Sequence, residues 1–134
     1  MAEVLELEIA TAERLLVREH VTEAQIPAAN GYIGVLPGHA PLLSELGTGV
    51  LSYVSERRRR ALAVSGGWIE VLGDSVRVLA SAAEKADEID VHRAEEALKR
   101  ARSRLERSDP TLDIARALNA MKRAQARLEA AQKG

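Results

Sequence analysis

ASAAEKADEIDVHRA, residues 80–94, decides the fold, because the pattern of the chain changes there once. Upstream, apolar residues alternate with polar ones, as in residues 5–9, which is the period of a half-buried β-strand. Downstream, residues 88–106 contain neither Gly nor Pro and are rich in Ala, Leu, Lys, Arg and Glu, which favours helix. The change predicts an all-β part over residues 1–86 and a helical part over residues 87–134.

The upstream part reads as many short strands separated by turn residues. The expected strands cover residues 5–9, 14–21, 22–28, 50–56, 61–65, 68–72 and 75–80. Gly66-Gly67 and Gly73-Asp74 have the form of tight hairpin connections, and the run Arg57–Arg60 is expected in a solvated hairpin turn. Short strands with closely spaced turns predict a β-sandwich or flattened barrel.

The downstream part predicts two antiparallel helices. Ser108-Asp109-Pro110 separates a helix over residues 88–106 from one over residues 112–132, and so short a connection favours a hairpin. The two helices repeat each other at an offset of 23 residues, and each carries an alanine-rich stripe. Alanine buries little area, so we expect the hairpin to open more easily than the head. The fold class is therefore α+β: an all-β sandwich or flattened barrel, then a two-helix hairpin.

Composition argues against several functions. Cysteine is absent, and His20, His39 and His92 lack metal-ligand spacing, so no metal site is expected. No catalytic constellation is recognisable, so the chain is expected not to be an enzyme in its own right. Aromatic residues make up only 2% of the chain, which leaves few stacking partners and argues against nucleic-acid binding. Neither a signal peptide nor a membrane span is expected.

Four arginines form the sharpest constellation. Arg93 and Arg100 are seven residues apart, and Arg123 and Arg127 four apart, so each pair shares a helix face. Folded antiparallel, the helices bring these cations together near Asp90 and Glu84, where guanidinium groups would suit phosphates. The alternative is a solvated face with ordinary ion pairs such as Asp90–Arg93. Periodicity alone favours the alternative.

GYIGVLPGHAPLL at residues 31–43, SGGWIEV at 65–71 and residues 80–89 resemble the epsilon subunit family of bacterial and chloroplast rotary ATP synthases. The resemblance covers nearly the whole chain. It implies a non-catalytic central-stalk subunit that binds the gamma subunit and the c-ring and couples rotation to ATP synthesis. It also implies a hairpin that extends toward the catalytic beta subunits and blocks ATP hydrolysis. The expected location is the cytoplasmic face of the bacterial membrane, peripherally, as part of the complex.

The resemblance also implies binding residues. Some family members bind ATP through I/L-D-x-x-R-A, and a regulatory ATP is the only small molecule implied; no cofactor is required. The implied nucleotide-binding set is Glu84, Ile89, Asp90, Arg93, Arg100, Arg123 and Arg127. The c-ring contact falls on His39 and on Tyr32, which stands where the family has a glutamate, and the beta contact on Arg116, Lys122 and Arg123. Without the family, the alternative is a stand-alone nucleotide-sensing or adaptor module, which co-purification with gamma would separate.

Overall fold

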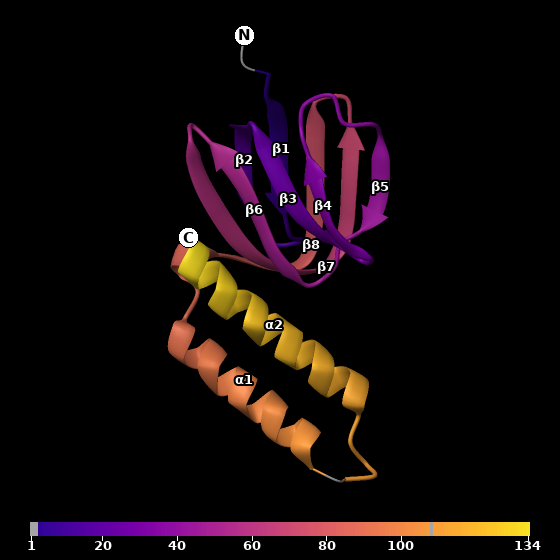
Figure 1. Cartoon of the computed structure of the whole chain (residues 1–134), viewed down its shortest axis with the longest axis vertical. Helices are drawn as coiled ribbons and strands as arrows, with labels where there is room; N and C mark the ends of the chain where they lie inside the picture. Colours follow the sequence, from indigo (N-terminus) through magenta and orange to yellow (C-terminus); the bar gives the residue numbers. More distant parts are fainter. Residues whose placement is uncertain (1–2, 108) are drawn as a thin grey trace.

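The computed structural model describes residues 3–107 and 109–134 and contains a β head followed by a helical hairpin (Figure 1). The strands are β1 Leu5–Ala10, β2 Leu15–Val21, β3 Glu23–Ala28, β4 Gly31–Val35, β5 Leu42–Glu45, β6 Gly49–Ser55, β7 Arg58–Leu72 and β8 Ser75–Lys85. A short 3-10 turn, η1 Ala86–Glu88, leads to α1 Val91–Glu106 and α2 Ile114–Lys133.

The strands form one folded-over sheet in the order β2-β1-β8-β7-β6-β3-β4, with β5 paired to β7. All pairings are antiparallel except the parallel pair β1 and β8. The first half of β7 pairs with β6 and its second half with β5. This single strand therefore passes from one layer to the other, and the predicted sandwich is confirmed.

The hairpin predicted at Gly66-Gly67 is wrong. Both glycines lie inside β7, with φ of +68° and +121°, and β7 keeps its register with β8 on either side of them. A side chain at residue 67 would overlap the carbonyl oxygen of Leu79. The pair therefore bends one long strand between the layers. By contrast, Gly73-Asp74 does connect β7 to β8 as predicted.

The arginine run is only partly in a turn. Glu56 and Arg57 have φ of +51° and +66° and form the two-residue connection between β6 and β7. Residues 58–60 already belong to β7, where they are exposed. The predicted solvated hairpin is therefore present but ends one residue into the run.

An aliphatic core fills the head. Leu5, Leu7 and Ile9 are fully buried and alternate with half-buried polar residues, as their period of two predicts. Tyr53 is also buried, and its hydroxyl donates a 2.7 Å hydrogen bond to Glu19. Burial among these aliphatic side chains stabilises the head through the hydrophobic effect.

The helices begin later than the sequence suggested. Residues 86–88 form η1, so α1 begins at Val91 rather than residue 88, and α2 begins at Ile114. Asp90 and Asp113 cap the two helices, because each carboxylate accepts a 3.0 Å bond from a backbone N–H three residues on. The 23-residue repeat thus places equivalent caps as well as equivalent stripes.

The hairpin lies folded against the head, with α2 between the head and α1 (Figure 1). Four stripe alanines are buried between the helices: Ala94, Ala101, Ala117 and Ala124. The other face of α2 packs on the head in a docking cluster, which consists of Val50, Ala61, Ala63, Ile89, Ala126 and Ala130, with Ala131 at its edge. Small side chains thus dominate both contacts of α2.

Within residues 3–107 and 109–134, no helix is both long and apolar enough to cross a membrane. In the same part of the chain, no group of His, Cys, Asp or Glu side chains is arranged to hold a metal ion.

Candidate functional site

A cavity of about 480 Å³ lies where the head meets the hairpin. The end of β8, η1 and both helices contribute to its walls. Its lining residues are Glu84, Glu88, Asp90, Arg93, Ala94, Ala97, Arg100 and Arg127. Five of the seven nucleotide-binding residues expected from the sequence therefore converge, drawn from segments up to 43 residues apart.

The two remaining expected residues lie elsewhere. Ile89 is buried in the docking cluster and does not line the cavity. Arg123 is half-buried beside Arg127 and lines a separate cleft of only about 20 Å³ between α2 and the head. The docked hairpin thus directs Arg123 toward the head rather than into the larger cavity.

Among the residues that the structure describes, one ion pair joins the hairpin to the head, and both of its members line the cavity. The Nε of Arg127 on α2 donates to Oε1 of Glu84 on β8 at 2.6 Å, with both side chains about one third exposed. A charge-assisted hydrogen bond of this kind favours the docked position of α2. Arg127 and Glu84 therefore line the cavity and also form the ion pair that holds α2 against the head.

Two cations in the cavity remain available for a ligand. Among the described residues, neither Arg93 nor Arg100 forms an ion pair. The alternative interpretation, a solvated helix face, predicts an ion pair between Asp90 and the Arg93 guanidinium. The structure does not contain this pair, because the Asp90 carboxylate accepts a hydrogen bond from the Arg93 backbone N–H instead. Two unpaired guanidinium groups two helical turns apart suit an elongated anion such as a polyphosphate.

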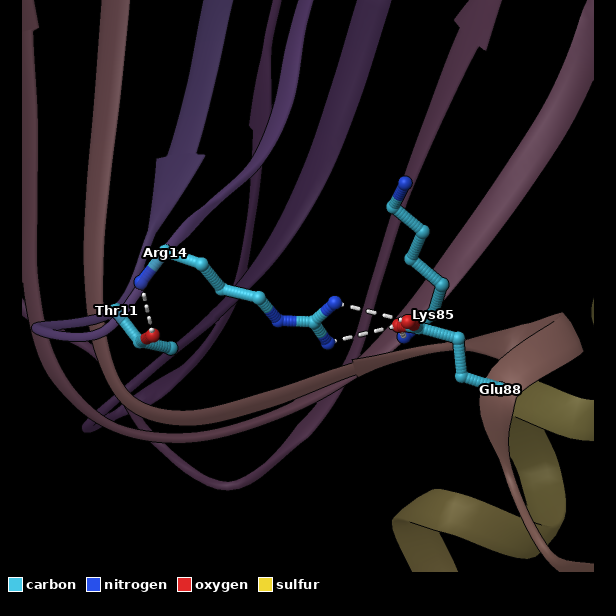
Figure 2. A network of polar contacts seen from close by, with 4 residues as sticks. All are labelled: Thr11, Arg14, Lys85 and Glu88. Atoms are coloured by element: carbon cyan, nitrogen blue, oxygen red, sulfur yellow. Dashed lines mark hydrogen bonds and ion pairs between the residues drawn. The ribbon is translucent and has the colours of Figure 1, made fainter.

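Glu88 is the charged residue of the cavity lining that sequence reasoning missed. Figure 2 shows its carboxylate facing the guanidinium of Arg14, which donates two 2.9 Å hydrogen bonds to it. The backbone N–H of Lys85 donates a third, at 3.1 Å. The bonds from Arg14 and then from Lys85 lower the pKa of Glu88 to about 2, and Glu88 raises the pKa of Arg14. Glu88 is therefore a fixed negative charge at neutral pH.

Arg14→Ala is expected to raise the pKa of Glu88 from about 2 toward the ordinary value near 4.5. Lys85 would hold it slightly below that value. Since the folded-state pKa is the lower one, the bond stabilises the fold above about pH 4.5 and this contribution is lost as the pH falls toward 2. Carboxyl ¹³C NMR titration measures the shift, with Arg18→Ala as control. A midpoint near 4.5 in the unsubstituted chain would contradict the expectation.

The residues expected at the c-ring are placed as follows. Tyr32 on β4 is more than half exposed, and its hydroxyl accepts a 2.9 Å bond from the Val50 N–H. Because the hydroxyl accepts in this bond, Tyr32 keeps its own hydroxyl proton for donation. His39 lies in the connection after β4, and its Nδ1 is 2.6 Å from the Ala40 carbonyl oxygen, which makes Nδ1 the donor. Both side chains thus have a local role in the head.

The residues expected at the beta subunits differ in exposure. Arg116 and Lys122 on α2 are exposed, and Arg123 faces the head. The docked state therefore leaves two of these three cations accessible. Undocking α2 would expose the third.

A β-sandwich that carries an ion-paired helical hairpin, with a charged cavity at their joint, defines a class of two-part subunit. Comparison with known proteins shows which family this two-part chain belongs to. Residues 4–86 match the family model for the ATP synthase delta/epsilon chain β-sandwich domain, and residues 87–132 that for its long α-helix domain. The chain belongs to the ATP synthase delta/epsilon chain family, and is thus a subunit of that enzyme complex.

Individual relatives agree with the family models. The chain is similar to the ATP synthase epsilon chain of Solibacter usitatus, with 60% identity over 101 residues, which are 75% of each chain. It is 52% identical to that of Koribacter versatilis over 110 residues, or 82% of this chain and 78% of the relative.

Solved structures share the fold. A chain in the Euglena gracilis mitochondrial ATP synthase OSCP/F1/c-ring assembly superposes with a TM-score of 0.82 at 26% identity, covering 96% of this chain and 81% of that one. A chain of the Tetrahymena thermophila central stalk/c-ring has the same fold at 12% identity, with a TM-score of 0.57.

Proposed function

We propose that the chain is a non-catalytic rotor subunit that senses ATP through the joint cavity and restrains ATP hydrolysis when its hairpin opens. The observation that carries this proposal is the origin of the cavity's charged residues. Glu84 comes from the head, and Glu88 and Asp90 come from the linker, which is residues 86–90 between β8 and α1. Arg93 and Arg100 come from α1, and Arg127 from α2. Only the docked hairpin assembles them.

The proposed sensing follows from this assembly. A ligand that binds one conformation in preference to another shifts the population toward the one it binds. ATP held between Arg93 and Arg100, with Arg127 and Glu84 closing the far wall, would therefore stabilise the docked hairpin. When ATP is scarce, the hairpin is free to leave the head.

Arg100→Ala is expected to weaken ATP binding about tenfold or more, since hydrogen bonds to charged groups contribute roughly 1.5–3 kcal/mol. Arg102→Ala, an exposed arginine on the same helix and outside the cavity lining, is the matched control and should bind as the unsubstituted chain does. Isothermal titration with ATP in the absence of Mg²⁺ measures both. No binding up to millimolar ATP by the unsubstituted chain, or equal losses in both variants, would end the sensing proposal.

The head is proposed to bind the gamma subunit and the c-ring. An exposed apolar row crosses four strands on its outer face, because Trp68, Leu79, Ala10 and Leu15 are successive cross-strand partners. Trp68, Leu79 and Leu15 are each at least half exposed. Contiguous exposed apolar surface of this kind marks protein interaction sites, and the row suits the gamma subunit. Tyr32 and His39 are proposed to meet the c-ring loops.

The hairpin is proposed to act on the catalytic beta subunits. Arg116, Lys122 and, after undocking, Arg123 present positive charge on α2. Charge complementarity steers such a surface toward acidic loops. The complex would then hold the chain peripherally at the cytoplasmic face of the membrane.

A further inference from the structure

The lining of the joint cavity has no net charge by itself. Its three carboxylates are Glu84, Glu88 and Asp90, and its three guanidinium groups are Arg93, Arg100 and Arg127. A neutral lining attracts a polyphosphate weakly, because each carboxylate repels the phosphates that the arginines attract. Something else must offset one of the carboxylates if the cavity is to take such an anion.

Arg14 supplies that charge from outside the lining. It stands in the connection between β1 and β2, 74 residues before Glu88, and bonds both oxygens of that carboxylate at 2.9 Å. With the Lys85 N–H, three donors occupy the Glu88 carboxylate (Figure 2). Counted together, Arg14 and the charged residues of the lining carry a net charge of +1.

A closed turn holds Arg14 in place. The hydroxyl oxygen of Thr11 accepts from the backbone N–H groups of Glu13 and Arg14, each at 3.3 Å. The Thr11 N–H donates to the Arg14 carbonyl at 2.9 Å. This turn fixes the backbone from which the guanidinium extends to η1. The bonds from Arg14 to Glu88 therefore connect the head to the linker at a residue that lines the cavity.

We propose that Arg14 is a positioning residue for the anionic ligand: it neutralises Glu88 and turns both of its oxygens away from the phosphates. The inference rests on the proposed ATP site. Arg14 touches no ligand. It acts through Glu88, so its effect depends on the charge of Glu88.

A charge cycle tests this dependence with ATP as the probe. The four proteins are the unsubstituted chain, Arg14→Ala, Glu88→Gln and the double variant. Arg14→Ala leaves Glu88 uncompensated and should weaken ATP binding about fivefold, the scale of one surface charge near another. Glu88→Gln keeps an oxygen for the Lys85 N–H and should bind ATP at least as tightly as the unsubstituted chain. The double variant should return to within about twofold of the unsubstituted chain.

Each result of the titration decides the matter. If the double variant binds as weakly as Arg14→Ala, Arg14 acts only as a tether and the inference is wrong. If all four proteins bind alike, Arg14 has no role and the inference again fails, while the ATP site stands. If the unsubstituted chain binds no ATP, the proposed function fails and takes this inference with it. Arg18→Ala is the control, since Arg18 pairs with Glu6 outside the cavity, and it should bind normally.

Discussion

Gly67→Ala is expected to lower the free energy of unfolding of the head by about 2–6 kcal/mol. Two costs add. At φ +121° a residue with a side chain is strained by roughly 1–3 kcal/mol. The new methyl group would also overlap the Leu79 carbonyl oxygen, and that oxygen belongs to the backbone of β8, which cannot rotate away. The backbone of β7 or β8 must shift to relieve this overlap, and the shift costs about 1–3 kcal/mol more.

Gly73→Ala is the matched control for this prediction. Gly73 also has positive φ, at +61°, but nothing lies within 4 Å of the position its Cβ would take. It should therefore cost only about 1–2 kcal/mol, the strain of the left-handed backbone. Urea unfolding followed by the fluorescence of Trp68 measures both variants. Equal losses would mean that the close approach of β7 and β8 adds nothing to the strain.

Gly67 also explains why part of the fold was beyond sequence reasoning. The alternation of Leu5, Leu7 and Ile9 was enough to predict a strand with one buried face, because burial in a sheet follows local periodicity. A glycine pair, however, marks a hairpin and a bend in a long strand by the same local signal. The contact of residue 67 with Leu79 on β8 distinguishes them, and it depends on the tertiary fold.

In the candidate site, too, some residues follow from local sequence patterns and others depend on the tertiary fold. Asp90 and Arg93 stand in one local motif, and Arg100 follows two helical turns later, so their convergence follows from helix geometry. Arg123 shares a helix face with Arg127, yet only Arg127 reaches the larger cavity, because Arg123 lies about one helical turn farther along α2. The bond from Arg14 to Glu88 links distant segments, and no pattern within either one indicates it.

Ala130→Leu is expected to shift the hairpin away from its docked position. Ala130 is fully buried in the docking cluster, between α2 and the head residues Val50, Ala61 and Ala63. Extra methyl groups in a packed contact cost about 1–3 kcal/mol, which corresponds to roughly a 5- to 150-fold change in the docking equilibrium. Amide exchange in α2 should accelerate to a similar degree, because the undocked hairpin keeps only its alanine seam and is marginally stable.

Ala115→Leu separates the docking effect from a general effect on the helix, because Ala115 is an exposed alanine of α2 and should leave exchange unchanged. In the assembled complex, the proposed brake predicts the direction in which Ala130→Leu changes the rate of ATP hydrolysis. A hairpin released from the head is more available to the catalytic subunits, so Ala130→Leu should hydrolyse ATP more slowly than the unsubstituted complex. A chain truncated after residue 87 gives the unbraked rate. Faster exchange with unchanged hydrolysis would show that the hairpin opens without acting as a brake, since the docking cluster would then control a motion that the catalytic subunits do not sense.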